Sequence, residues 1–475
     1  DIPDGDLFVF NTDDDTEVDT VSSIGTLLYG ITATASGKVF IAMTDARNQV
    51  NGRAGTGDPK HSLLELENRA FLNQLGVVDC TTGECDKSTF ELEPLPPEHP
   101  EPEEALAIPF GIQISDDEST LAITAAGSNT LFTLDARTGA VLGRVDVGWA
   151  PRGVALQSDD DGKPEKAWVY NAVENTVSMV AFDSPAEMTV TRTLELEDPT
   201  DAQVKLGRAM FNNAMASTTG TFACVSCHPD GLSDQLMWNL ESPPCNRPGC
   251  TQYQLRATMP IRGLRDTEPY HWDNVPGNPY TVSNGESLDE PVEPTCDPEA
   301  DGEFACIRHV VDGGLASTMC DPETCLPGPS GMKGALTEEE RHALSVFLLS
   351  VPNAQGRERP FDDRITQQAR AGYFQWNHNN GRNTCGNSSC HSAPLMTRIE
   401  QVGQYAVPSF RGITDRFMLT NNGRFGGMEH QLRHLPDGPD EKTFAVGGFV
   451  LGGGFHTSSG YTEQGPWQML LENAQ

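Results

Sequence analysis

The sequence predicts a multidomain protein in which an all-β part, residues 1–198, is followed by two tandem, mainly α-helical domains, residues 199–355 and 356–475. Three observations predict this fold class. Short alternating apolar segments separated by Asp, Gly, Asn and Ser turns occupy the first part. Apolar residues with helical spacing occupy the second part, and two similar cysteine–histidine motifs divide it in two. A chain of 475 residues also exceeds one ordinary core, so two or three domains are expected.

The all-β part contains a weak internal repeat. Residues 110–117 return 42 residues later as residues 152–159, and residues 29–33 lie about two periods upstream. Each unit continues with a strand, an Asn-Thr turn and a further strand. The clearest strands are predicted at residues 7–10, 39–42, 121–124 and 167–170. A period near 42 residues with four short strands is typical of a β-propeller blade, so we predict a partial β-propeller, with a plain β-sandwich as the alternative.

About three and a half such blades fit before residue 198, fewer than a closed propeller needs. The repeat resembles that of YVTN-type propellers, in which a strand–turn–strand of this kind closes each blade. We expect the remaining blades in a segment upstream of Asp1, or another chain that completes the ring, and we favour the first. Residues 48–104, acidic and rich in proline near Pro94, are predicted to form a long loop within one blade.

Three helices are predicted beyond residue 198. Residues 201–214 have helical apolar spacing, and residues 336–351 form the clearest helix. In the second of these, Thr337 and Glu340 form a capping box. A third helix is predicted at residues 366–376, and the glycine-rich end of the chain has no assignment.

The motif Cys224-Val-Ser-Cys227-His228 lies just after the first of these helices. Two thiols separated by two residues meet the two vinyl groups of one porphyrin, and the adjacent histidine is placed to become the proximal iron ligand. The motif therefore predicts a covalently bound c-type haem. A disulfide or a thiol-redox pair beside an incidental histidine is the alternative.

A second motif, Cys385-Gly-Asn-Ser-Ser-Cys390-His391, follows about 160 residues later. Its thiols are separated by four residues, a wider spacing that also carries haem in some multihaem cytochromes. The sequence therefore predicts two c-type haems, with His228 and His391 as proximal ligands.

The remaining eight cysteines form local pairs in Gly-, Pro- and Asp-rich contexts, and none of the Cys-x4-Cys pairs is followed by histidine. The simplest pairing is 80–85, 245–250, 296–306 and 320–325, as short disulfide loops. Zinc binding is the rival interpretation. Disulfides and haem attachment both predict a periplasmic or extracellular location, so we expect Asp1 to follow a processed export signal.

The chain is strongly acidic, with 32 Lys and Arg against 68 Asp and Glu and a formal net charge of −36. Such a surface repels nucleic acid and anionic membranes. It can steer a basic redox partner such as a small cytochrome, although a merely solvated acidic surface is the alternative. No run of 18 apolar residues is present, so no membrane span is predicted.

The two haem regions repeat one plan. Residues 207–211 and 370–374 precede the two motifs as similar helical segments, and a proline, an arginine and a glycine follow each motif. This duplication predicts two tandem cytochrome c-like domains. Arg262 and Arg411 occupy equivalent places in the two copies, where bidentate pairing with haem propionates or a structural salt bridge is expected.

Over about residues 200–440 the chain resembles the bacterial di-haem cytochrome c peroxidase and MauG-like family. The resemblance rests on a Leu-Gly-x-x-x-Phe helix, the Cys-x-x-Cys-His-x-x-Gly segment, a proline–arginine motif at Pro260 and Arg262, and the His271-Trp272-Asp turn. It implies that Trp272 is a relay between the haems, or else a buried core tryptophan. It also implies a calcium ion between the haem domains.

The sixth iron ligands are candidates only. The resemblance implies a methionine beyond the second motif for the electron-transfer haem, and that region holds four candidates, Met418, Met428, His430 and His434. For the first haem His271 is the best-placed residue, with Tyr270 and His309 behind it.

The sequence departs from the family after the Trp272 turn. Peroxidase members carry a helical segment there with a catalytic carboxylate and a glutamine, whereas residues 275–280 and the Pro- and Cys-rich region that follows disfavour a helix. Glu286, Glu290 and Glu293 lie in this region, but nothing positions them as a general base. The predicted function is therefore electron transfer by a secreted di-haem c-type cytochrome. The alternatives are an active di-haem peroxidase or oxidase, acting on hydrogen peroxide or a protein, and a structural subunit of an extracellular haem-carrying assembly.

Overall fold

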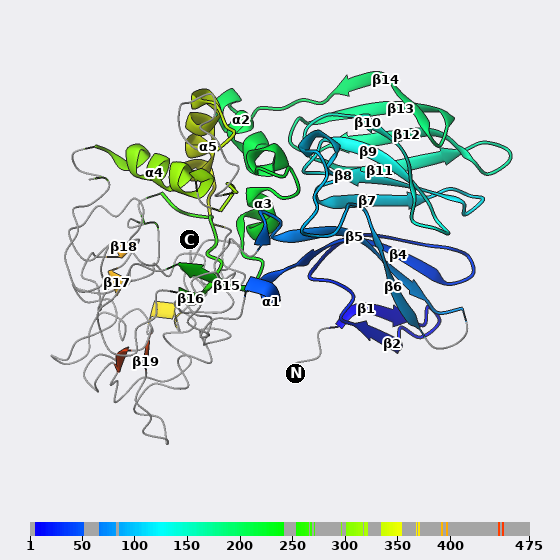
Figure 1. The fold of residues 1–475 in the computed structure, drawn as a ribbon, viewed down its shortest axis with the longest axis horizontal. Helices are drawn as coiled ribbons and strands as arrows, with labels where there is room; N and C mark the ends of the chain where they lie inside the picture. Colours follow the sequence, from blue (N-terminus) through cyan, green and yellow to red (C-terminus); the bar gives the residue numbers. More distant parts are fainter. Residues whose placement is uncertain are drawn as a thin grey trace. The chain divides into compact units, whose positions relative to one another are not determined.

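The computed structural model describes residues 5–51, 66–81, 85–241, 253–265, 301–316 and 334–353, the shorter pieces 267, 270, 296, 318–321, 367 and 369–370, and four two-residue strands (Figure 1). The chain divides into two compact units. The first unit comprises Asp1–Val50, Leu63–Ser226 and Leu315–Glu340, and the second comprises Asn51–Ser62, Cys227–Gly314 and Arg341–Gln475.

The first unit is built from antiparallel sheets in which every strand pairs with the next strand along the chain. A hairpin consists of β1 (Gly5–Phe10) and β2 (Glu17–Ser22). The next sheet consists of β3 (Leu27–Ala33), β4 (Lys38–Ala46), β5 (Phe71–Asp79) and β6 (Asp86–Glu91). The third consists of β7 (Pro109–Ile114), β8 (Thr120–Ala125), β9 (Thr130–Asp135) and β10 (Val141–Asp146). The fourth consists of β11 (Pro151–Ser158), β12 (Pro164–Asn171), β13 (Thr176–Ser184) and β14 (Glu187–Glu195). One hairpin and three four-stranded meanders fit the partial β-propeller that the sequence predicts.

These sheets pack face to face in chain order, like successive propeller blades (Figure 1). Leu7 and Val21 of the hairpin pack against Ile41 and Val78 of β3–β6. The opposite face of β3–β6 packs on β7–β10 through a core that includes Phe40, Leu75, Leu121, Ile123 and Phe132. Sheet β7–β10 in turn packs on β11–β14 through Ala122, Leu131, Val169 and Val180. All four predicted strands lie in this unit, within β1, β4, β8 and β12.

The first strand of each four-stranded sheet carries a glycine at the same position of the repeat, and in β3 and β7 this glycine meets the next sheet. A Cβ atom on Gly30 of β3 would collide with the carbonyl oxygen of Phe110 on β7. A Cβ atom on Gly111 of β7 would lie 3.0 Å from the carbonyl oxygen of Arg152 on β11. The residues before these glycines form a column, because the rings of Tyr29 and Phe110 stack at 4.8 Å and the Arg152 guanidinium lies 5.0 Å from the Phe110 ring. Glycine therefore allows neighbouring first strands to approach closely.

The long loop predicted at residues 48–104 is wrong, because β5 and β6 lie within this range and complete the sheet begun by β3 and β4. Strand β5 is central and almost wholly buried, whereas β6 is an exposed edge strand of polar residues. The β5–β6 hairpin was not predicted, because the charged residues of β6 and the prolines after it are typical of a loop. The short helix α1 (Asn48–Asn51) precedes it.

Two of the predicted disulfides are confirmed. The Cys80–Cys85 disulfide links the end of β5 to the start of β6. The Cys296–Cys306 disulfide links the first turns of helix α4 to Cys296, which precedes the helix in the chain. Cys320 is also disulfide-bonded. Its predicted partner Cys325 and the predicted pair at 245 and 250 lie outside the described residues.

Helix α2 (Ala202–Asn212) confirms the first predicted helix and belongs to the first unit. Asp201 caps it by accepting hydrogen bonds from the backbone N–H groups of Gln203 and Val204. The Arg152 guanidinium donates to Asn212 Oδ1 at 3.3 Å, and the N–H of Ala214 donates to the carbonyl of Gly127 at 2.9 Å. The segment leading to Cys224 is thereby fixed to the last two sheets.

The second unit contains the hairpin β15 (Met237–Glu241) and β16 (Tyr253–Ala257) and most of α4 (Glu303–Ala316) and α5 (Glu338–Ser350). Helix α5 confirms the clearest predicted helix and its capping box, since Thr337 N donates to Glu340 Oε2 at 2.7 Å and Glu340 N donates to Thr337 Oγ1 at 3.3 Å. Arg341, fully buried, donates to Asp312 of α4 at 2.8 Å.

Helix α4 was not predicted, because the prolines and cysteines around it obscured an apolar stripe. Cys306, Ile307, Val311 and Leu315 form this stripe and are buried. The third predicted helix, residues 366–376, falls mostly outside the described residues. Four two-residue strands form two small hairpins: β17 (His391–Ser392) with β18 (Met396–Thr397), and β19 (Ala445–Val446) with β20 (Phe449–Val450).

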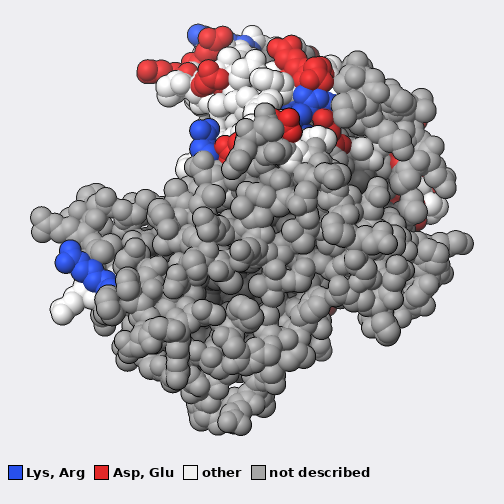
Figure 2. All heavy atoms as spheres, turned by 90° about the vertical axis from the view of Figure 1, so that its left-hand side faces the viewer, with Lys and Arg blue, Asp and Glu red and all other residues white. Residues whose placement is uncertain are grey.

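In the small part of the surface that is not grey in Figure 2, acidic side chains lie among uncharged residues, together with a few basic side chains. This agrees with the net charge of −36. Among the described helices, none is both long and apolar enough to cross a bilayer.

Candidate haem-attachment site

The first cysteine–histidine motif forms one turn of helix, α3 (Cys224–Cys227). A local hydrogen-bond pair closes this turn, since Ser226 N donates to the Ala223 carbonyl at 2.9 Å and Ala223 N donates to Ser226 Oγ at 3.1 Å. Both cysteines are half-buried thiols. Burial raises the pKa of the Cys224 thiol to about 11, because the charged thiolate is disfavoured away from water. Cys224 is therefore protonated at neutral pH.

His228 follows α3 directly, and its Nδ1 atom is buried. Burial lowers the pKa of His228 to about 4, and hydrogen bonds with the backbone of Leu232 and Met259 oppose this shift without cancelling it. The imidazole is therefore neutral at physiological pH, which is the form that ligates a metal.

A tight turn, Pro229–Gly231, follows His228 and contacts the predicted arginine, Arg262. Gly231 N donates to the His228 carbonyl at 3.0 Å, and Ile261 N donates to the Gly231 carbonyl at 3.0 Å. Arg262 Nε donates to the Asp230 carbonyl at 2.9 Å. Gly231 has φ +77, and a Cβ atom there would lie 3.2 Å from Arg262 Cγ. The predicted proline–arginine motif is thus brought against the residues that directly follow His228.

A buried carboxyl group, missed by the sequence analysis, lies beyond this turn. Asp234 N donates to the Cys227 carbonyl at 2.9 Å, while the Asp234 side chain accepts from Trp238 Nε1 at 2.8 Å and from Leu236 N at 3.0 Å. Burial raises the pKa of Asp234 to about 6 despite these hydrogen bonds and one from Thr258. The sequence offered one signal for this contact, namely that a carboxylate acceptor, Asp234, and an indole donor, Trp238, lie only four residues apart.

The segment before α3 is anchored by buried hydrogen bonds. Thr219 N and Thr219 Oγ1 donate to Oδ1 and to the carbonyl of Asn68, at 3.0 and 2.7 Å. Asn73 Nδ2 donates to the Thr221 carbonyl at 3.0 Å, and Thr218 N donates to the Met319 carbonyl at 3.0 Å. Two asparagines next to and within β5 therefore hold the backbone that enters the first motif.

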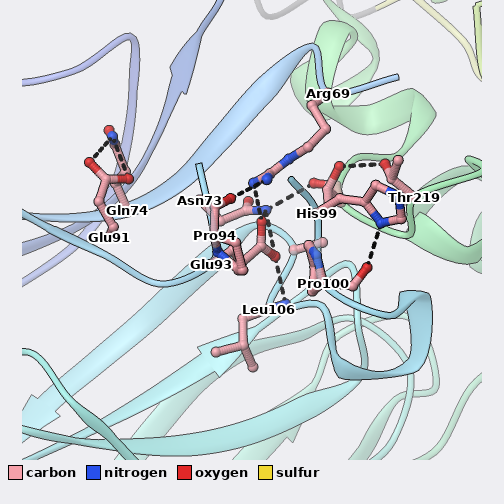
Figure 3. A network of polar contacts seen from close by, with 12 residues as sticks. Arg69, Asn73, Gln74, Glu91, Glu93, Pro94, His99, Pro100, Leu106 and Thr219 are labelled. Carbon is pink, nitrogen blue, oxygen red and sulfur yellow. Dashed lines mark hydrogen bonds and ion pairs between the residues drawn. The ribbon is translucent and has the colours of Figure 1, made fainter. Parts of the chain in front are cut away.

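A buried ion pair supports the second of these asparagines, Asn73 (Figure 3). Arg69 Nη2 donates to Glu93 Oε2 at 2.8 Å, and the two side chains are 1% and 2% exposed. Asn73 Nδ2 lies 3.1 Å from both Glu93 carboxylate oxygens, and Leu106 N donates to Glu93 Oε1 at 2.9 Å. Arg69 also donates to the carbonyls of Pro94 and Glu98.

The Glu93 carboxylate and both terminal nitrogens of Arg69 are hydrogen-bonded, which offsets much of the cost of their burial, whereas the buried Arg69 Nε atom has no hydrogen-bond partner among the described residues. Burial raises the pKa of Glu93, and Arg69 acts in the opposite sense. Burial also lowers the pKa of Arg69, against the attraction of Glu93. Removing one partner of such a pair costs about 3–5 kcal/mol, because a buried charge is left uncompensated. Sequence reasoning missed this cluster, since its members lie in the stretch taken for a loop.

Of the other predicted site residues, only a few are described. Tyr270 is buried, and its hydroxyl donates to Glu303 Oε1 at 3.0 Å on α4. His309 is exposed on α4, and His391 begins the short strand β17. The remaining candidates fall outside the described residues: His271, Trp272, Cys385, Cys390, Arg411, Met418, Met428, His430 and His434.

Within the described part of the chain, no three His, Cys, Asp or Glu side chains gather as a metal site. The calcium ion implied by the family resemblance therefore stays a prediction.

No protein-family model matches the chain, and no curated protein matches it. Solved structures similar to it include hydrazine synthase of Kuenenia stuttgartiensis, with 15% identity over 36% of this chain and 50% of that one and a TM-score of 0.28. The Cps50 (Swd1) β-propeller domain of Myceliophteria thermophila shares 12% identity over 40% of this chain and 53% of that one, with a TM-score of 0.27. A protein from Lactobacillus plantarum shares 13% identity over 41% and 50%, with a TM-score of 0.27. This chain spans about half the length of these structures, and likenesses at this level carry no argument about its activity.

Proposed function

We propose that this chain is a di-haem c-type cytochrome that carries electrons, exported to the periplasm or the cell exterior. The observation that carries the proposal is the donor set at the first motif. Two thiols one helical turn apart, Cys224 and Cys227, precede a histidine held in its neutral form. These residue types fit a c-type haem, because each thiol S–H can add across one vinyl group and a neutral imidazole can ligate iron.

The chain's own residues would then have distinct roles. Cys224 and Cys227 would hold the first haem covalently, and His228 would supply a nitrogen ligand to its iron. Cys385, Cys390 and His391 would do the same for the second. Arg262 fixes the turn after His228 through its hydrogen bond to the Asp230 carbonyl. Its positive charge would also allow it to pair with a haem propionate. When bound, the haems supply reversible one-electron redox chemistry.

Two disulfides support an oxidising compartment, where such bonds persist and c-type haem is attached. The acidic surface supports a basic protein as redox partner. No observation on the described residues favours peroxide chemistry, so electron transfer is the function proposed.

Haem content tests the proposal directly. The chain is produced in a bacterial periplasm together with haem-attachment machinery, and its intact mass and pyridine haemochrome spectrum are measured. We expect two covalent haems. The double variant Cys224→Ala/Cys227→Ala should lose one, and Cys385→Ala/Cys390→Ala should lose the other. The matched control Cys80→Ala/Cys85→Ala removes two cysteines that form a disulfide and should retain both haems.

A mass with no haem, or with one haem in the unaltered chain, contradicts the proposal. Function is then tested by film voltammetry, where two reversible one-electron waves are expected, and by spectra recorded with added hydrogen peroxide. Six-coordinate low-spin spectra that peroxide leaves unchanged agree with electron transfer. A high-spin haem that reacts with peroxide would instead support the enzymatic alternative.

A further inference from the structure

The segment that enters the first motif is held at three consecutive residues, Thr219, Gly220 and Thr221. Both threonines are buried. The Thr221 carbonyl accepts a hydrogen bond from Asn73 of β5 at 3.0 Å. Gly220 has φ +68, and a Cβ atom there would lie 2.7 Å from the Pro102 carbonyl oxygen, so only glycine fits where the two backbones meet. The segment therefore has one register against β5 and the loop after β6.

Asn68 makes the contact with Thr219 and joins it to a third part of the first unit. Asn68 Oδ1 accepts from Thr219 N at 3.0 Å, and the Asn68 carbonyl accepts from Thr219 Oγ1 at 2.7 Å. Asn68 Nδ2 donates to the Thr318 carbonyl at 3.5 Å. One buried asparagine thus links the turn before β5, the segment before the first motif and residues 318–321.

The turn that carries Asn68 has a backbone conformation that residues other than glycine rarely adopt. Glu67 and Asn68 have φ angles of +45 and +52, in the left-handed region. Arg47 Nη1 donates to the Leu66 carbonyl and to Glu67 Oε2, both at 2.8 Å. Arg69 N donates to the same Leu66 carbonyl at 2.6 Å. Such conformations persist only where the surroundings impose them, and they are concentrated at functional sites. These contacts hold the turn so that Asn68 meets the segment before the motif.

We propose that Asn68 is a positioning residue for the first haem. Its hydrogen bonds fix the segment at Thr219, and the buried residues Phe222 and Ala223 carry this constraint to Cys224. A haem joined to Cys224 is then restrained relative to the first unit, because its attachment moves only as far as the backbone of the cysteine moves. Hydrogen-bonded partners of this kind tune a metal centre without ligating it. This inference rests on the proposed function, to which it adds a residue that the sequence did not indicate.

Asn129 provides a matched control within the same unit. It also has a left-handed backbone, with φ +56, and its Oδ1 atom accepts from Ala150 N at 2.9 Å. Glycine at either position keeps this backbone conformation accessible and removes one amide side chain. The Asn129 bond, however, joins β7–β10 to the residue before β11. A difference between Asn68→Gly and Asn129→Gly therefore reports the action of Asn68 on the motif, and not a general loss of stability.

Hydrogen exchange, followed by mass spectrometry of peptides from the full chain, measures how firmly the segment is held. In Asn68→Gly the amides of residues 218–223 should exchange about 10-fold or more faster, as expected when ordinary hydrogen bonds are lost. Peptides from β11–β14 should exchange as in the unaltered chain, which shows that the variant is folded. In Asn129→Gly the amides of residues 218–223 should be unaffected.

The midpoint potential of each haem, measured by film voltammetry, tests the role toward haem. The two waves are assigned with the variants that lack one pair of haem-binding cysteines. Asn68→Gly should shift the potential of the first haem and leave that of the second unchanged, because the second motif belongs to the second unit. Asn129→Gly should shift neither potential.

A second pair of variants tests the same contact from the other side. Thr219→Val keeps the shape of the side chain and loses the hydroxyl that donates to the Asn68 carbonyl, so it should shift the first potential in the way that Asn68→Gly does. Thr219→Ser keeps the hydroxyl and should leave the potential unchanged. This pair replaces Asn68→Gly if that variant does not fold.

Three results would overturn the proposal. The first is exchange at residues 218–223 that Asn68→Gly leaves unchanged. The second is an equal effect of Asn68→Gly and Asn129→Gly on the first haem. The third is a first-haem potential that stays the same although the segment exchanges faster. Absence of haem from the unaltered chain would instead contradict the proposed function, and the exchange experiment would still measure how firmly Asn68 holds the segment.

Discussion

At the residue scale, the carboxyl group of Asp234 beside the first motif has a strongly raised pKa. Its oxygens accept hydrogen bonds from Trp238 and Leu236, yet burial dominates and raises the pKa of Asp234 to about 6 from an ordinary value of 3.8. The backbone of Asp234 is bonded to Cys227, so its ionisation acts on the peptide that carries the first motif. The group is 5% exposed, so solvent screens it little.

This perturbation predicts a pH dependence of stability. Because folding raises the pKa of Asp234, the native state binds the proton more tightly than the unfolded chain. The stabilising contribution is therefore full below about pH 4 and is lost as pH rises through 6, a difference of about 3 kcal/mol by pH 8. Urea denaturation of the unaltered chain and of Asp234→Asn, in the same haem-loading state, measures it. The difference between their free energies of unfolding should change by this amount between pH 4 and pH 8. Parallel pH profiles would contradict the assignment.

At the element scale, packing between sheets depends on what faces the first strand of each sheet. Gly30 and Gly111 are crowded by the backbone of the following first strand, whereas no described backbone crowds Gly153. The three glycines look alike in the repeat, but their surroundings in the folded chain differ. Their substitutions should therefore have different effects on stability.

The variant Gly30→Ala should destabilise the first unit by about 1–3 kcal/mol, because the added methyl collides with the Phe110 carbonyl and overpacks the β3–β7 contact. Gly153→Ala is the matched control and should change stability by less than about 0.5 kcal/mol. Both are measured by urea denaturation under the same conditions. Equal losses in the two variants would show that the cost arises within the strand and not from the neighbouring sheet.

The elements that sequence reasoning missed share one cause. Strand β6 has a mostly exposed, charged sequence, and it is held as a strand by pairing with the buried strand β5. Helix α4 lies among prolines and cysteines, and it is held by burial of one stripe and by the Asp312–Arg341 pair. In both cases partners in the folded chain outweigh a local composition that is typical of loops.

At the scale of the whole molecule, charge is the dominant property. A net charge of −36 sets up a long-range field that attracts a basic partner and repels an acidic one. This field acts beyond the contact residues and is screened by salt over about 10 Å at 0.1 M ionic strength and about 3 Å at 1 M.

The proposed function therefore predicts a salt-dependent partner reaction. The rate of electron transfer with a small basic cytochrome should fall about 10-fold or more between 10 mM and 500 mM salt, because screening removes the electrostatic steering. An acidic cytochrome of similar size is the control, and its rate should rise with salt. Stopped-flow absorbance measures both. Rates that salt leaves unchanged would show that the acidic surface has no steering role.

Much of the local structure was predictable from the sequence. Four strands, the helices α2 and α5, the capping box at Thr337 and two disulfide loops follow from short-range patterns, and each is present. The first motif was also evident in the sequence, whereas the bond from Arg262 to the turn after His228 was not predicted, and pairing of Arg262 with a haem propionate stays a prediction. The second motif and the candidate sixth ligands stay predictions.

The sequence by itself determined the blade repeat, the cysteine pairs and the Cys224–His228 donor set, because each depends on residues a few positions apart. Only the tertiary structure decided how these parts are held. The Arg69–Glu93 pair, the bonds from Asn68 and Asn73 to the segment before Cys224, and the raised pKa of Asp234 arise from burial and from residues far apart in the chain. Periodicity reveals which side of a strand is apolar, but packing decides which neighbour covers it.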